Sequence, residues 1–239
     1  MSHGGNAKQD PVRGLAVSEN GMKLELDQTE LRLGRRSELG FRIVGSDGRP
    51  LHDFEVEHDK RMHFIVARRD MRGFQHLHPK LGSDGTWKTR LTLSEAGSYR
   101  VFADFKRNGR SETFAADVHV DGPVDWKALP ASSTTATTAD GYLVRVRGAS
   151  AAAGREASLR FDIRRDGRPI RVQRYLGAGG HLVALREGDM AYLHVHPTGG
   201  GGQVSFATEF PSAGRYRLFL QFKHRGRVHT AAFTKQVAR

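Results

Sequence analysis

Apolar and polar residues alternate along most of the chain with the two-residue period of β-strands. In the first half the alternating segments are 22–26, 39–44, 87–93 and 99–105, and in the second half they are 143–147, 158–163, 204–208 and 216–222. Alternation places the apolar side chains of a strand on one face. The 3.6-residue period of an amphipathic helix is not convincing in any segment, so the pattern predicts an all-β protein.

The second half of the sequence repeats the first. Residues 62–68 correspond to 180–186, and residues 73–79 correspond to 191–197, both at an offset of 118 positions. Farther on, 96–106 corresponds to 213–223 at an offset of 117 positions. A repeat of this kind indicates that the chain is a tandem duplication of one unit of roughly 100 residues.

The unit length and the strand pattern together predict the domain organisation. About seven short strands in about 100 residues is typical of immunoglobulin-like sandwiches. A tyrosine follows an Ala-Gly corner in each copy, at Tyr99 and Tyr216, as in the tyrosine corner of Greek-key folds. We predict two tandem immunoglobulin-like Greek-key β-sandwich domains, with cupredoxin-like sandwiches as the alternative. The predicted ranges are a flexible tail (1–13), domain 1 (14–121), a linker (122–140) and domain 2 (141–239).

Composition narrows the possible chemistry. The 239 residues include no cysteine, which excludes disulfides, zinc–thiolate sites, iron–sulfur clusters and thiol nucleophiles. Histidine, by contrast, occurs 12 times. Half of these residues fall at equivalent positions of the two copies with the spacing His-x12-His-x-His-Pro, and they are His63, His76, His78, His181, His194 and His196.

The spacing predicts that three imidazoles converge in each copy. Two short apolar segments joined by a polar turn near residue 70 form an antiparallel pair, which places His63 opposite His78. His76 and His78 share a sheet face because they are two residues apart. Three imidazoles with an open coordination position suit Cu(II) or Zn(II). The alternative is structural: the His-x-His-Pro strand end hydrogen-bonds loop carbonyls, and the proline terminates the strand.

Other residues are weaker candidates. The thioethers of Met62, Met71 and Met190 favour copper if they point into a site, although Met62 faces away from His63 unless the strand bulges. Asp104 and its equivalent Gln221 either orient a histidine or lie on the surface, and the surface position is favoured. Six further histidines are predicted to be solvated: His3, His52, His58, His119, His224 and His229.

The histidine motifs resemble those of a known family. Met-His-x4-Arg-x-Asp-Met followed by Phe-x-His-x-His-Pro, and Gly-Gly-His-Leu-Val-Ala-Leu-Arg followed by Tyr-Leu-His-Val-His-Pro, resemble bacterial, actinobacterial-type exported proteins described as heavy-metal-binding or YtkA-like. The resemblance covers residues 14–239. It implies export, a β-sandwich fold, and the handling of copper or a related metal through the six paired histidines. It also implies that a signal peptide preceded this sequence; a cytoplasmic location stays open.

The sequence is compatible with three functions. The first is a non-enzymatic extracytoplasmic protein that stores, buffers or delivers copper, with zinc as the alternative metal, and that passes the ion to a transfer partner. The second is a metalloenzyme with an open three-histidine site; enzymatic activity is the less favoured reading. The third is a metal-free adhesion or interaction module that binds an anionic cell-envelope polymer.

The charge of the chain bears on the third function. The net charge is +12, of which +9 lies beyond residue 120, and this favours an anionic neighbour. The arginines of the second copy are dense at Arg164, Arg165, Arg168, Arg171 and Arg174. A nucleic acid is a poor candidate because no nucleic-acid-binding motif accompanies them. No apolar run is long enough for a transmembrane segment.

Overall fold

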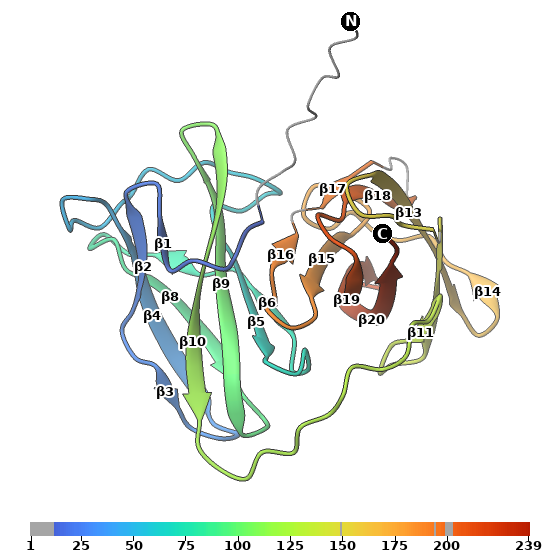
Figure 1. The fold of residues 1–239 in the computed structure, drawn as a ribbon, viewed down its shortest axis with the longest axis horizontal. Coiled ribbons are helices and arrows are strands. Elements are labelled where there is room, and N and C mark those ends of the chain that lie inside the picture. The colour runs from blue at the N-terminus through green and yellow to red at the C-terminus, as the bar shows by residue number, and fades with distance from the viewer. Residues whose placement is uncertain (1–11, 149, 194, 199–202) are drawn as a thin grey trace, which may run out of the picture.

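The computed structural model describes residues 12–148, 150–193, 195–198 and 203–239, and only the backbone of His196. All regular elements in these ranges are strands, arranged as two β-sandwich domains of immunoglobulin-like type (Figure 1). Seven of the eight predicted strand segments lie within observed strands, and the eighth, 87–93, extends one residue beyond the observed strand Trp87–Thr92. In the described part of the chain, no helix is long and apolar enough to cross a membrane.

The first domain consists of two sheets. One sheet has the strand order β1-β2-β4-β8-β7, with bounds Ser18–Glu19, Met22–Leu26, Arg36–Val44, Trp87–Thr92 and Lys80–Leu81. The other has the order β3-β10-β9-β5-β6, with bounds Glu30–Leu31, Arg110–Val120, Gly97–Arg107, His63–Arg68 and Gln75–Leu77. The alternating side chains of both sheets meet in a core that includes Phe41, Phe64 and Trp87.

The second domain repeats this plan. Its larger sheet has the order β11-β12-β13-β18-β17, with β14 paired to β13, and bounds Thr135–Thr137, Tyr142–Arg147, Glu156–Arg165, Val204–Glu209, His196–Pro197 and, for β14, Arg168–Pro169. Its smaller sheet has the order β16-β15-β19-β20, with bounds Tyr192–Leu193, His181–Arg186, Gly214–His224 and Arg227–Val237. Residues 135–137 fall inside the range predicted as a linker, but they form strand β11, which pairs with β12.

The tyrosine corners form in both domains. The hydroxyl of Tyr99 donates to the carbonyl of Glu95 at 2.8 Å, and that of Tyr216 donates to the carbonyl of Ser212 at 3.0 Å. Both rings are almost fully buried. The corner predicted from the Ala-Gly-x-Tyr phrase is therefore present at equivalent positions, as expected for Greek-key sandwiches.

The domains pack through the sheets that carry β5 and β15, which we call the inner sheets. A hydrophobic cluster joins them and draws residues from both domains: Ile65, Ala67, Met71, Phe102, Ala115, Val183, Leu185, Met190, Tyr192 and Phe219. Phe74 stacks on Phe219 with ring centroids 4.1 Å apart, and at the equivalent positions Tyr192 packs on Phe102 at 5.5 Å. These reciprocal contacts give the interface the self-complementary character of a twofold dimer.

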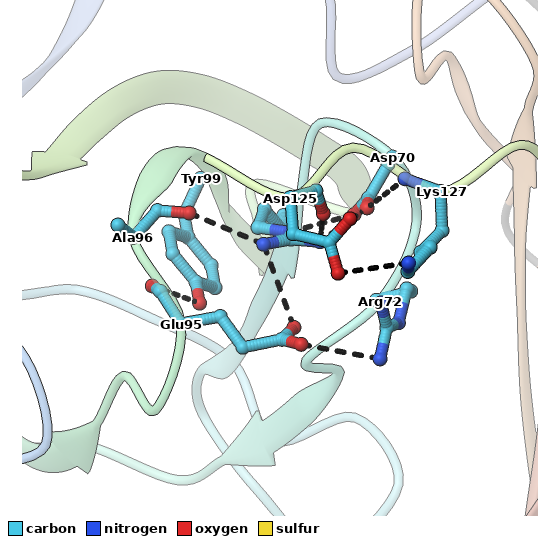
Figure 2. A network of polar contacts seen from close by, with 8 residues as sticks. Asp70, Arg72, Glu95, Ala96, Tyr99, Asp125 and Lys127 are labelled. Carbon is cyan, nitrogen blue, oxygen red and sulfur yellow. Dashed lines mark hydrogen bonds and ion pairs between the residues drawn. The ribbon is translucent and has the colours of Figure 1, made fainter. Parts of the chain in front are cut away.

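A buried ion pair fixes the chain that leaves the first domain (Figure 2). The Arg68 guanidinium bonds the carboxylate of Asp70, and their side chains are 2% and 0% exposed. Arg68 also donates to the carbonyls of Ala96 and Asp125, while Asp70 accepts the backbone N–H of Lys127. The start of the segment between the domains is thus tied to the turn after β5.

The segment that precedes the first strand of the first domain also contacts the second domain. The backbone N–H of Tyr192 donates to the carbonyl of Arg13 at 2.9 Å. At Gly14, where φ is +68°, an added Cβ would lie 2.8 Å from the Cβ of Tyr192. The close approach and the left-handed conformation both require glycine at this position.

Candidate metal centre between the repeats

The hairpin β5–β6 brings the first three predicted histidines together. Its register pairs Phe64 with Leu77 and Ile65 with His76, so His63 lies across from His78 as the spacing predicts. One nitrogen of each of the three rings lies within 4.8 Å of the nitrogens of the other two. Strand pairing therefore positions this triad, with His63 and His76 on neighbouring strands.

The triad faces the second domain. His63 shares its strand face with Ile65 and Ala67, because side chains alternate along β5, and both of those residues belong to the inter-domain cluster. His63 is 3% exposed, and His76 and His78 are half-buried. The imidazoles thus lie in the interface between the inner sheets.

Hydrogen bonds orient two of the rings. Nδ1 of His63 and Nε2 of His76 face each other at 3.0 Å. The remaining ring nitrogens face oxygen acceptors: Nε2 of His63 lies 3.1 Å from the carbonyl of Glu57, and Nδ1 of His76 lies 2.7 Å from Oε1 of Gln221. Gln221 also donates its amide to Oγ1 of Thr230 at 3.2 Å.

The second repeat supplies a further imidazole to this cluster. The ring of His181 stacks on His63 with centroids 5.3 Å apart, and it lies 4.5 Å from the ring of His76. His194 and the side chain of His196 lie outside the described residues. The backbone of His196 begins β17, which pairs with β18. Of the second predicted triad, His181 is thus placed against the first triad.

The equivalent residues Asp104 and Gln221 are buried, so the prediction that they lie on the surface was wrong. They are 3% and 8% exposed, and each lies across from the first histidine of its own copy, Asp104 from His63 and Gln221 from His181. Asp104 accepts hydrogen bonds from Oγ1 of Thr113 at 2.9 Å and from the hydroxyl of Tyr192 at 3.1 Å. Its negative charge favours a cation in the neighbouring cluster.

Burial keeps the imidazoles of His76 and His78 uncharged. Desolvation lowers the pKa of His76 well below its ordinary value, and His63 and His78 act in the same direction. Desolvation also lowers the pKa of His78 to about 3, helped by His63 and Lys60. Among the described atoms, Nε2 of His78 has no hydrogen-bond partner although it is buried. Neutral imidazoles are the form that binds metal ions.

The three methionines lie elsewhere. Met62 packs in the core of the first domain, on the strand face opposite His63. Met71 and Met190 pack in the inter-domain cluster, and Met71 follows the far end of β5, a strand length of roughly 17 Å from His63. Gly180 replaces Met62 in the second copy because an added Cβ would lie 2.7 Å from the carbonyl oxygen of Gln221.

The prediction that the remaining histidines are solvated was wrong for His58, His224 and His229, while His3 lies outside the described residues. His224 is half-buried, and its Nδ1 lies 2.8 Å from the hydroxyl of Tyr142. The half-buried ring of His58 lies 6.1 Å from that of His63 and 5.9 Å from that of His181, so His58 borders the cluster. His229 is 6% exposed and contacts the carboxylate of Asp140 at 2.5 Å. His52 is exposed. His119 forms an exposed group with Glu30 and Asp121.

A signal for the interface was present in the sequence. Strand β5 reads His-Phe-Ile-Val-Ala-Arg and is buried at every position. A run without alternation is typical of a strand covered on both faces. That run indicates that the face carrying His63 is covered by another part of the protein, but not that Gln221 and Tyr192 of the second repeat lie there.

The comparisons with known proteins concern the fold. A family model described as "Domain of unknown function (DUF8832)" matches residues 16–122 and again 136–239. No curated protein matches the chain.

Solved structures with similar folds share little sequence with it. FdeC, an Escherichia coli adhesin, is 15% identical with a TM-score of 0.30, and the match covers 94% of this chain and 66% of that one. A Salmonella alpha-2-macroglobulin is 13% identical with a TM-score of 0.33, over 95% of this chain and 15% of that one. The present chain thus spans less than two thirds of either protein. A chimeric titin Z1Z2 tandem is 14% identical with a TM-score of 0.25, over 90% and 100%.

Proposed function

Both repeats of the chain belong to the DUF8832 family of domains of unknown function, and we propose from the geometry between them that the protein binds a metal ion. The proposed ligands are the imidazoles of His63, His76 and His78. The preferred metal is copper and the alternative is zinc, because nitrogen ligands suit both ions and Cu(II) binds such sets more tightly.

One observation carries the proposal: two ring nitrogens face each other at 3.0 Å while their outer partners are acceptors. If both rings are neutral, protons on Nε2 of His63 and Nδ1 of His76 satisfy the Glu57 carbonyl and the Gln221 amide oxygen. Both inner nitrogens then present lone pairs to each other, and a cation between them relieves the repulsion.

A metal ion fits this gap better than a proton does. A tetrahedral ion with metal–nitrogen bonds of 2.0–2.1 Å separates its ligand nitrogens by about 3.3 Å, close to the spacing observed. An extra proton would create a buried imidazolium, which the low pKa of His76 disfavours. The outer hydrogen bonds of both rings are those that orient histidine ligands in metal sites.

The proposed site is shared between the repeats. The second repeat contributes Gln221, which orients His76, and His181, whose ring lies 4.5 Å from that of His76. We therefore propose one composite centre, in which the first triad is joined by His181 and Gln221 of the second repeat. Storage, buffering or delivery of the ion outside the cytoplasm is the role that the family resemblance implies, and it forms part of this proposal.

Metal titration tests the proposal. Protein prepared without a polyhistidine tag is stripped of metal and titrated with Cu(II) and Zn(II) against a competing chelator, with elemental analysis of the product. We expect His63→Gln to lose more than about 100-fold in affinity, beyond the 10–100-fold that loss of an outer partner costs. The matched control is His52→Gln, at an exposed position. Equal affinities of the two variants would contradict the proposal.

A further inference from the structure

An open pocket of about 560 Å³ leads to the proposed metal site. His76 and His78 line it together with residues of both repeats. Its volume lies within the range of small-molecule binding sites, about 300–1,000 Å³, and exceeds what a metal ion with one bound water needs. The pocket therefore has room for a ligand beside the imidazoles.

The wall of the pocket is positively charged. Lys60, Arg174 and Lys223 line it, against one carboxylate, that of Asp59. Within the described residues, none of the three cations forms an ion pair. Some arginines elsewhere in the described chain are paired, for example Arg186 with Asp189. Cations left without partners along one concave wall form an attractive site for an anion.

Apolar groups complete the pocket. Leu176 and Val228 line it beside the ring of Tyr175, whose hydroxyl is 3.5 Å from Oε1 of Gln221. Burial raises the pKa of Tyr175 to about 12, so the hydroxyl stays protonated and can donate. A mixture of cationic, donor and apolar groups is complementary to a small organic acid.

We infer that this pocket binds a small carboxylate that coordinates the metal held by His76 and His78. The inference rests on the proposed function, because the carboxylate oxygen takes the coordination position that the imidazoles leave open. Lys60 and Arg174 attract the ligand from opposite repeats, so its binding also bridges the two domains.

The test uses the copper-loaded full-length chain. Azide, a small anion whose binding to Cu(II) gives a charge-transfer absorption, is titrated first, and succinate is then added as a competitor. We expect azide to bind and succinate to displace it. In Lys60→Gln/Arg174→Gln both anions should bind at least tenfold more weakly while copper affinity does not fall. The control removes one lysine and one arginine outside the pocket, in Lys23→Gln/Arg171→Gln.

The outcomes separate the two proposals. If copper binds but succinate does not displace azide, or if the pocket variant binds both anions as tightly as the control, the carboxylate site is overturned and the metal site stands. If the wild-type chain takes up neither copper nor zinc, both are overturned. A loss of copper affinity in the pocket variant alone would also contradict the inference, because its cations are proposed to hold the anion and not the metal.

Discussion

The two histidine hairpins share one sequence pattern but are built differently. In the first, pairing with β5 continues through Leu77, which holds His76 in the inner sheet. In the second, the described pairing with β15 includes Tyr192 and Leu193, and His196 pairs with the other sheet. The first hairpin supplies a triad, whereas the second repeat supplies Gln221 as the oriented partner of His76. The two repeats thus contribute different residues to one cluster.

The turns of the two hairpins differ in the same way. Arg68 and Asp70 are 2% and 0% exposed, whereas their counterparts Arg186 and Asp189 are 20% and 40% exposed. The first pair is buried because the segment at Asp125 and Lys127 covers it (Figure 2). The same turn motif is therefore buried in the first repeat, where the segment between the domains crosses it, and partly exposed in the second repeat.

Breaking these pairs should produce the largest difference between the repeats. Asp70→Ala leaves the guanidinium of Arg68 buried without its main partner, and we expect a loss of about 3–5 kcal/mol in the free energy of unfolding. Asp189→Ala removes a partly exposed pair and should cost about 1 kcal/mol. Urea denaturation of both variants measures the difference. Equal losses would show that the covering segment does not bury the first pair in solution.

The next largest effect concerns the role of the second repeat. Gln221→Leu removes the acceptor for Nδ1 of His76, and we expect metal affinity to fall about 10–100-fold. Gln236→Leu, at an exposed position of the same domain, serves as the control. Chelator competition gives both affinities. Unchanged affinity in Gln221→Leu would mean that the first hairpin binds metal without help from its partner.

The smallest effect is a pH dependence that distinguishes His78. Its pKa is lowered to about 3 in the folded chain, against about 6.5 when unfolded. The unfolded state therefore binds more protons between these values, and the metal-free protein loses stability as the pH falls from about 6.5 towards 3. At pH 5 the share of His78 is about 1–2 kcal/mol.

Replacement of this histidine checks the assignment. In His78→Gln the difference in unfolding free energy between pH 7 and pH 5, measured by urea denaturation, should be smaller than in the wild type by that amount. The exposed control His52→Gln should keep the wild-type difference. An equal difference between pH 7 and pH 5 in all three proteins would show that a group other than His78 causes the pH dependence.

Much of the fold followed from the sequence. Alternation located the strands, and the spacing around residue 70 gave the register that sets His63 across from His78. The docking of the inner sheets did not follow, because alternation within one domain does not show which outward face a second domain covers. Asp104 was consequently expected at the surface. The hydrogen bond between Gln221 and His76 joins the two repeats, so it can be recognised only when the packing of the domains is known.

The central claim, that one metal centre is shared by the two repeats, is tested most directly by a double-mutant cycle of His76→Gln and His181→Gln in Cu(II) affinity. A shared centre predicts that the two substitutions are coupled by at least about tenfold, or about 1.4 kcal/mol, because their rings contact the same cluster. Losses that add to within about 0.3–0.5 kcal/mol would show two independent sites and contradict the account.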